Sequence, residues 1–250
     1  MSAILQSLHI NQLLWHASHL PSDPNAFVAS GYTQLDHKLN GGWPDKGIIE
    51  LQSDGIGIGE IRLLFPALSQ LCDKDMLYAW IAPPGRLNGQ TLANAGLPLD
   101  KTLIATDVSA KESFWLAEKC LRSGCCAAVV LWCNELESTQ ARRLQLAAKE
   151  GNSLGFIIRP QSAVEQSLPV SIRMRATANQ QGLNVNIDKR LGGNPVAPFT
   201  LNMHEKWPEL TQPPAPSSSA NNPANNTANN PANNNVVNFN HHINSRKKTA

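Results

Sequence analysis

The segment Asp54–Ile61, which reads DGIGIGEI, has the glycine spacing of a phosphate-binding loop that leads into a helix. In the loop GxxxxGK[ST], backbone N–H groups bind the phosphates, the lysine neutralises the terminal phosphate and the hydroxyl residue binds magnesium. Here Asp54 replaces the first glycine, Glu60 the lysine and Ile61 the hydroxyl residue. The turn is therefore retained, whereas the groups that neutralise a phosphate and bind a metal ion are absent.

The charge of Glu60 decides between two interpretations of this loop. A carboxylate about 4 Å from a phosphate charge is repelled by roughly 4 kcal/mol at an effective dielectric constant of 20. The same carboxylate stabilises a helix when it lies at the helix N-terminus. We therefore predict that Gly55, Gly57 and Gly59 serve a tight strand-to-helix turn, and that the protein binds no nucleotide and needs no cofactor.

Apolar strands alternate with helices through the middle of the chain, which predicts a parallel sheet covered on both faces. The expected strands are 47–52, 76–83, 101–108, 127–133 and 154–160, and the expected helices are 59–71, 87–96, 109–123 and 138–150, with Ser109 and Ser138 as N-caps. Residues 170–190 instead alternate around an Asn-Gln-Gln-Gly turn and predict an antiparallel hairpin at the sheet edge. The predicted fold class is α/β, a mostly parallel sheet flanked by helices.

Composition divides the chain into three predicted parts: an N-terminal helix and linker (1–27), a core domain (28–205) and an Asn/Pro-rich tail (206–250) that we expect to be disordered. The net charge is +2, and three basic residues at 246–248 follow the last acidic residue, so the remainder carries −1. Such a balance gives no overall field that attracts nucleic acid.

The five cysteines form no CxxC pair and the seven histidines show no ligand spacing, so we predict reduced thiols, a cytoplasmic location and no metal site. No apolar run is long enough to cross a membrane, and no membrane partner is expected. Among the tryptophans, Trp80, Trp115 and Trp132 are expected in the core and Trp43 at an exposed turn.

Two segments resemble the ATPase core of RecA-type recombinases: SGYTQLDHKLNGGWPDKGIIEL (30–51), which precedes the glycine loop, and CLRSGCCAAVVLWCN (120–134). This resemblance implies that Trp132 stands where the metal-binding Walker B aspartate would be, and that Pro84 stands near the position of the catalytic glutamate. Lysine, hydroxyl, metal-binding acid and catalytic acid are thus all replaced. We predict a RecA-like core that is not an enzyme.

More closely, residues 8–200 resemble the ImuA family of translesion-synthesis accessory proteins, through GIGEIRLLFPAL, YAWIAPP and RRLQLAAKEGNSLGF. The resemblance implies a non-catalytic role in SOS-induced mutagenic DNA synthesis, with RecA, an ImuB-like polymerase-related protein and an error-prone DNA polymerase subunit as partners. The SOS cell-division inhibitor SulA resembles residues 59–160, which implies an alternative role as an inhibitor that binds FtsZ. The entrance 28–50 and the segment DKRLGGNP (188–195) favour the first interpretation.

Two groups of residues are candidates for contacts with a partner or DNA. The first lies on the predicted N-terminal helix, which either packs on its own domain or docks on a partner. The second is basic and either contacts phosphates or forms a solvated face, so direct DNA binding is left open. The candidates are Leu8, Leu14 and Trp15 in the first group, and Arg142, Arg143, Arg173, Arg175, Lys189 and Arg190 in the second.

Overall fold

The computed structural model describes residues 27–161, 168–191, 193 and 196–212. The predicted N-terminal helix and most of the predicted tail lie outside these residues, and the three-part division of the chain stays a prediction. The strands are β1 (Phe27–Val28), β2 (Trp43–Pro44), β3 (Gly47–Ser53), β4 (Leu77–Ile81), β5 (Thr102–Ala105), β6 (Cys126–Trp132), β7 (Leu154–Pro160), β8 (Ile172–Asn179), β9 (Gly182–Lys189) and β10 (Val196–Asn202). The α-helices are α2 (Thr33–Leu39), α3 (Glu60–Gln70), α4 (Gly89–Asn94), α5 (Ala110–Arg122) and α6 (Ser138–Glu150).

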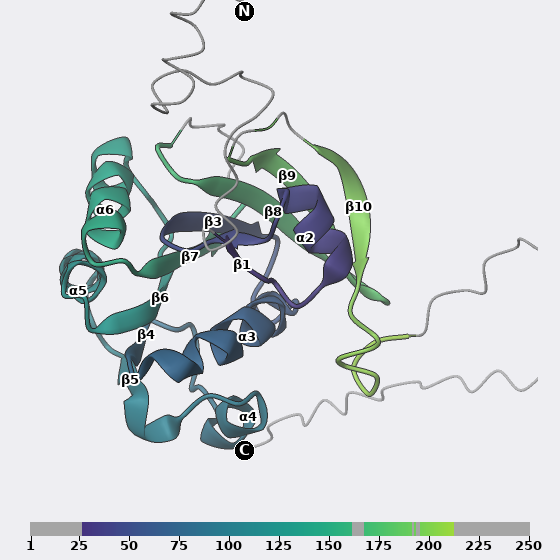
Figure 1. Cartoon of the computed structure of the whole chain (residues 1–250), viewed down its shortest axis with the longest axis horizontal. Coiled ribbons are helices and arrows are strands. Elements are labelled where there is room, and N and C mark those ends of the chain that lie inside the picture. Colours follow the sequence, from purple (N-terminus) through teal and green to yellow (C-terminus); the bar gives the residue numbers. More distant parts are fainter. Residues whose placement is uncertain (1–26, 162–167, 192, 194–195, 213–250) are drawn as a thin grey trace, which may run out of the picture. The chain divides into compact units, whose positions relative to one another are not determined.

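Within the described residues, one sheet of eight strands has the order β10-β9-β8-β3-β7-β6-β4-β5 (Figure 1). The six strands from β8 to β5 in this order are parallel to one another, whereas β9 is antiparallel to both β8 and β10. Strands β3 and β6 are buried along their whole length, as expected for parallel strands covered on both faces. The prediction of a mostly parallel sheet flanked by helices is confirmed.

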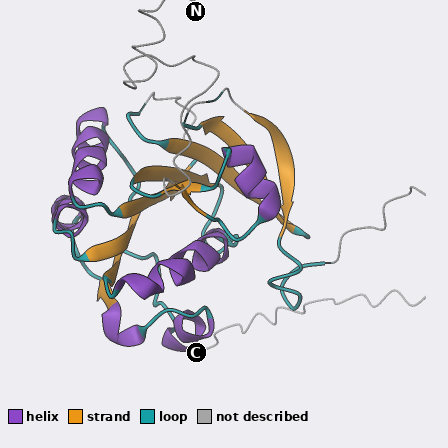
Figure 2. Cartoon of the chain, viewed as in Figure 1, coloured by secondary structure: helices purple, strands orange, loops and turns teal. Residues whose placement is uncertain are grey.

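Helices cover both faces of this sheet (Figure 2). Helices α5 and α6 pack on one face, where Leu121 and Leu144 meet Ile48 and Ile157. Helices α2, α3 and α4 belong to the larger core on the other face, which is built around Phe156. Helix α5 begins with the predicted cap, because the Ser109 hydroxyl accepts from the Glu112 N–H in a capping box. Helix α6 is capped instead by Glu137, so the prediction of Ser138 as its cap is wrong.

The predicted hairpin forms as β8 and β9, but it does not make the edge of the sheet. Strand β10 pairs antiparallel with β9 and lies outside it, with Leu201 opposite Leu183. Strand β10 was not predicted, because Pro198 interrupts its apolar alternation. This proline lies at a register shift between Val196 and Phe199. A proline is compatible with an edge strand, where its missing N–H is needed by no neighbour.

The burial of two tryptophans is the opposite of the prediction. Trp43 is fully buried and its ring meets Phe156 edge-on, with ring centres 5.6 Å apart, because strand β2 turns it into the core. Trp115 is 59% exposed on α5, because Ser113, Ala117 and Leu121 form the buried face of this helix and position 115 lies on the opposite side. Trp80 and Trp132 are buried as predicted.

Tyr32 joins segments from the two ends of the described chain. Its buried hydroxyl donates to the Arg62 carbonyl at 3.0 Å and accepts from Trp207 Nε1 at 3.1 Å. The Trp207 ring also packs near Phe65, with ring centres 6.1 Å apart. The segment after β10 is therefore part of the packed structure as far as Trp207. Burial, opposed by the Trp207 hydrogen bond, raises the pKa of the Tyr32 hydroxyl to about 12.

The pKa of Tyr32 predicts a loss of stability at high pH. The hydroxyl ionises near pH 10 in the unfolded chain but near pH 12 in the folded protein, so between these values the folded state binds more protons. The free energy of unfolding should therefore fall by about 2–3 kcal/mol as the pH rises from about 10 to about 12. Tyr32→Phe should lack this component in urea titrations over the same range. Equal losses in both proteins would contradict the assignment.

Candidate functional site: a cleft at the carboxyl ends of the parallel strands

The loops that follow β3, β4, β6 and β7 meet at one end of the sheet, because parallel strands place their carboxyl ends along the same edge. A cleft of about 1130 Å³ lies there. It is lined by the loop after β3, by Ala82 and Pro84 after β4, by the first turns of α5 and α6, and by Trp132–Glu135 and Ile158–Gln161. This end of an open α/β sheet is the usual place for a ligand.

The glycine loop binds its own carboxylate. Glu60 is the first residue of α3 and only 3% exposed. Its Oε1 accepts from the Gly57 N–H at 3.0 Å, and its Oε2 accepts from the Gly59 N–H at 3.1 Å. Gly57 and Gly59 both have positive φ angles, 77° and 116°, which glycine adopts without strain. The Glu60 carboxylate thus occupies backbone donors of the kind that bind an anion at a helix N-terminus.

The other residues of the predicted loop take no part in that contact. Asp54 and Gly55 are exposed beside the cleft, and Ile61 packs against the core at the start of α3. At the end of β6, Trp132 stacks on Trp80 with ring centres 6.1 Å apart and an interplanar angle of 26°. Pro84 lies exposed on the cleft lining. Neither position supplies an oxygen ligand for a metal ion.

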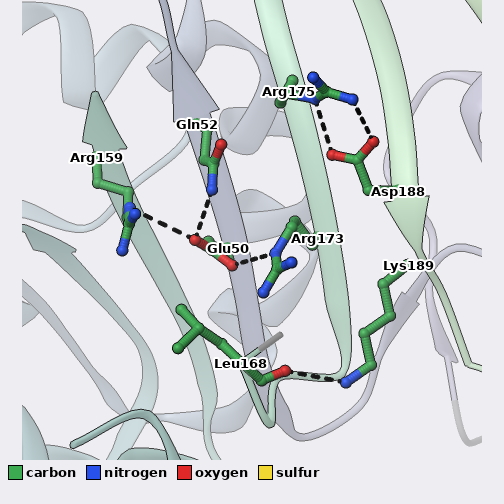
Figure 3. Close-up of polar contacts among 8 residues, drawn as sticks. All are labelled: Glu50, Gln52, Arg159, Leu168, Arg173, Arg175, Asp188 and Lys189. Carbon is green, nitrogen blue, oxygen red and sulfur yellow. Dashed lines mark hydrogen bonds and ion pairs between the residues drawn. The ribbon is translucent and has the colours of Figure 1, made fainter. Parts of the chain in front are cut away.

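A buried carboxylate, Glu50 on β3, lies among polar side chains of the neighbouring strands (Figure 3). Its Oε2 accepts from Arg173 Nε on β8 at 2.7 Å, and its Oε1 accepts from Gln52 Nε2 at 2.8 Å. Arg159 on β7 approaches from the other side, with its Nε 3.5 Å from Glu50 Oε1. Glu50 is fully buried, and it therefore links three adjacent strands through charged contacts.

The charges of this cluster do not balance, because two guanidinium groups share one carboxylate. Arg159 is 6% exposed, and its Nε and Nη1 have no hydrogen-bond acceptor among the described residues. Arg173 Nη2 is likewise buried without such an acceptor in this part of the chain. Arg159 also lines the cleft, so one of the two positive charges that share Glu50 belongs to a residue of the cleft wall.

One pattern in the sequence indicates this cluster, although the prediction above did not include it. A glutamate interrupts the apolar run GIIEL, and an arginine ends the apolar run GFIIR. Charged side chains are rarely fully buried unless they are paired. A charge inside each of two predicted buried strands therefore indicates an ion pair between them.

The predicted basic residues on the hairpin are engaged within the fold. Arg175 donates to both carboxylate oxygens of Asp188, at 2.9 and 2.6 Å (Figure 3). Lys189 Nζ donates to the Leu168 carbonyl at 3.1 Å, and burial together with the charge of Arg173 lowers the pKa of this lysine. Arg190 Nη1 donates to the Lys38 carbonyl at 2.6 Å. These three basic side chains of the hairpin and its end therefore donate hydrogen bonds to acceptors in the same chain.

The other residues predicted to contact a partner or DNA do not join the basic residues of the β8–β9 hairpin. Arg143 on α6 pairs with Glu118 on α5, and Arg142 is exposed on α6. Leu8, Leu14 and Trp15 lie outside the described residues. The described ranges contain no group of three or more His, Cys, Asp or Glu residues placed to hold a metal ion. No helix in these ranges is long and apolar enough to cross a membrane.

Comparison with known proteins identifies the family. A family model described as "Cell division inhibitor SulA" matches residues 51–155. Cell division inhibitor SulA of Citrobacter koseri is 33% identical over 125 residues, which span 50% of this chain and 69% of the relative. The chain belongs to the SulA family.

Other SulA relatives match a similar length of the chain. The Photorhabdus laumondii protein is 37% identical over 106 residues, and the Serratia marcescens protein is 36% identical over 100 residues. The chain spans 60% of the length of each. A crystal structure of SulA from Pseudomonas aeruginosa is 27% identical, with a TM-score of 0.39, and the match covers 45% of this chain and 98% of that one.

These findings correct the functional prediction. The relatives are named as cell division inhibitors, so the main prediction of an accessory protein in mutagenic DNA synthesis is wrong. The same findings contradict the predicted partners, which were RecA, the ImuB-like protein and the polymerase subunit. The ImuA resemblance is not confirmed. The alternative prediction, a SulA-type inhibitor, agrees with the family. A family named for inhibition also agrees with the prediction that the chain is not an enzyme.

The charged cluster predicts a strong effect of one uncharged substitution. Glu50→Gln removes the carboxylate and leaves the Arg159 and Arg173 guanidinium groups buried without an opposite charge. Breaking a buried ion pair in this way should lower the free energy of unfolding by about 3–5 kcal/mol, measured by urea denaturation.

The matched control is Glu135→Gln, at an exposed position on the cleft lining, and it should change stability by less than about 0.5 kcal/mol. A Glu50→Gln protein as stable as the control would show that the cluster does not hold the sheet together.

Proposed function

We propose that this protein inhibits cell division during the SOS response by binding FtsZ in the cytoplasm. The observation that carries the proposal is the match to proteins named cell division inhibitor SulA, at 37% identity over 106 residues and 33% identity over 125 residues. The family model matches from the end of β3 to the start of β7 and includes both α5 and α6. Inhibition of this kind requires a binding surface and no chemical step.

The exposed side chains of the matched segment suggest where that surface lies. Leu103 and Ile104 on β5 are 47% and 46% exposed, and Leu99, just before this strand, is 49% exposed. Strand β5 is the outer strand on its side of the sheet, since it pairs only with β4 among the described residues. An exposed apolar edge strand presents both unpaired backbone groups and apolar side chains to a partner. We therefore place the FtsZ-binding surface on Leu99–Ala105.

The glycine loop fits a non-catalytic mechanism, in which the core is RecA-like but no longer binds a nucleotide. In this proposal the segment Asp54–Ile61 derives from a P-loop, and Glu60 takes the place of the phosphate. The support is the pair of hydrogen bonds from Gly57 and Gly59 to the Glu60 carboxylate. Binding of FtsZ would then proceed without nucleotide exchange or hydrolysis by the inhibitor.

The direct test uses the purified full-length protein with purified FtsZ. We expect the protein to lower the GTPase rate of FtsZ and to reduce the amount of sedimented polymer, with a dose dependence that reaches a plateau. RecA filaments on single-stranded DNA serve as the negative bait in a parallel pull-down. Unchanged FtsZ assembly at a molar excess of the protein would overturn the proposed function.

The binding surface predicts which substitutions abolish inhibition. Leu103→Ser with Ile104→Ser removes apolar area from the exposed edge, and truncation of central interface residues costs about 1–2 kcal/mol or more each. We expect the double variant to require at least tenfold more protein for half-inhibition of the FtsZ GTPase, because about 1.4 kcal/mol corresponds to a factor of ten.

Leu210→Ser is the matched control, since Leu210 is 63% exposed and lies outside the matched segment. It should inhibit FtsZ like the original protein. Circular dichroism should show that all variants are folded. A fully active, folded double variant would exclude this edge of the sheet as the binding surface.

The loop geometry predicts that the protein does not respond to nucleotide. A ligand present at 100 times its dissociation constant stabilises a protein by about 2.7 kcal/mol. Because Glu60 occupies the loop donors, Mg-ATP at millimolar concentration should leave the thermal unfolding midpoint unchanged. A RecA protein provides the positive control. A clear upward shift of the midpoint would show that the loop still binds nucleotide.

A further inference from the structure

The chain contains two Asn-Gly pairs, and the structure holds them in different ways. Asn40-Gly41 follows α2, and Asn88-Gly89 connects the loop after β4 to α4 (Figure 1). Both asparagines are exposed to solvent. An asparagine followed by glycine is chemically labile, because the next backbone nitrogen can attack the side-chain amide carbon and glycine has no side chain to hinder that attack. The sequence alone therefore gives both pairs the same reactivity.

At the first pair, the attacking and the attacked groups are both held by hydrogen bonds. The Gly41 N–H donates to the Asp36 carbonyl at 2.9 Å. The Asn40 Oδ1 accepts from Arg190 Nη1, also at 2.9 Å, and this bond joins positions 150 residues apart. The fold also requires glycine there, since Gly41 has a φ angle of 137° and a Cβ atom would lie 3.0 Å from the Phe27 ring. Ring closure at the first pair therefore requires several contacts to break.

At the second pair, the corresponding contacts are local. The Asn88 Oδ1 accepts from the Gln90 N–H at 2.9 Å, which polarises the side-chain carbonyl for attack. Among the described residues, the Gly89 N–H has no hydrogen-bond acceptor. The fold does not require glycine here, because its φ angle is not in the left-handed region and a Cβ atom would meet only Leu99 Cδ1, at 3.9 Å. Helix α4 has six residues, of which only Leu92 is buried, so the backbone rotation that ring closure needs disturbs little packing.

We propose that Asn88 is a site of spontaneous deamidation in the folded protein, whereas Asn40 is protected. The Gly89 nitrogen attacks the Asn88 Cγ atom, so that a new C–N bond forms, the bond from Cγ to Nδ2 breaks, and ammonia leaves with the proton of the Gly89 N–H. Water then opens the succinimide ring at either carbonyl, which gives an aspartyl or an isoaspartyl residue. Neither step needs an oxidant or a reductant.

The conversion changes the surface beside Leu99. It replaces a neutral amide by a carboxylate, and the isoaspartyl form adds a methylene group to the backbone before Gly89. The Leu99 side chain is 49% exposed and lies next to Gly89, so converted molecules are altered beside a residue of the proposed FtsZ-binding surface. The conversion itself does not rest on the proposed function.

The test is incubation of the purified full-length protein at mildly alkaline pH, in water enriched in the heavy oxygen isotope, followed by peptide mass spectrometry. We expect the peptide with Asn88 to convert from amide to acid and to gain one heavy oxygen atom. The peptide with Asn40 should convert at least about tenfold more slowly, because two hydrogen bonds, one of them to a charged group, must first break. In guanidinium chloride the two peptides should convert at similar rates, since both contain the same reactive pair.

Gly89→Ala is the matched variant. The added methyl group fits beside Leu99, so circular dichroism should show a normal fold, whereas Asn88 should convert several-fold more slowly because the methyl group hinders the attack. An isoaspartyl methyltransferase should label the incubated original protein strongly and the variant weakly. Equal conversion of both asparagines in the folded protein, no conversion of Asn88 while the denatured chain converts, or an unchanged rate in Gly89→Ala would each overturn the proposal.

Discussion

The ion pairs of Glu50 constrain the centre of the sheet. They join β3 to β8 through Arg173 and to β7 through Arg159, which are the two strands hydrogen-bonded to β3. Because side chains alternate between faces, a slip of one residue in either pairing would move that strand's arginine to the opposite, apolar face and remove one of the two ion pairs of Glu50. A buried ion pair often adds little net stability, but it penalises wrong registers strongly. The register of the parallel strands, and with it the alignment of their carboxyl ends at the cleft, follows from this constraint.

The parallel core could be predicted from the sequence because its signal is local. Buried runs such as AAVVLWC and capped helices such as Ser109–Arg122 are determined by residues close together in the chain. The missed features depend on distant partners. Arg173 and Glu50 are separated by 123 positions, and strand β10 is defined by its pairing with β9 more than by its own pattern. The burial of Trp43 and the exposure of Trp115 likewise depend on what packs against them.

The candidate site was predicted in part. The glycine loop could be identified from its spacing, but its hydrogen bonds to Glu60 depend on backbone angles that the sequence does not specify. The functional error has a physical basis as well. The core at 59–160 was assigned to two families, and the entrance and hairpin were used to choose between them. The entrance helps to build the larger core through Leu35 and Trp43, and the hairpin does so through Met174 and Val185, so these segments support the fold whatever its surface binds.

The carboxylate in the glycine loop has a consequence for control. In a nucleotide-binding loop the bound anion is exchanged, and the protein alternates between states whose populations depend on the nucleotide concentration. Glu60 is covalently attached, so its local concentration at these donors is fixed and does not rise or fall with the abundance of a metabolite. This contact therefore supplies no nucleotide-dependent timer. If it arrests division, the length of the arrest is set by how much of the protein is made and how quickly it is removed.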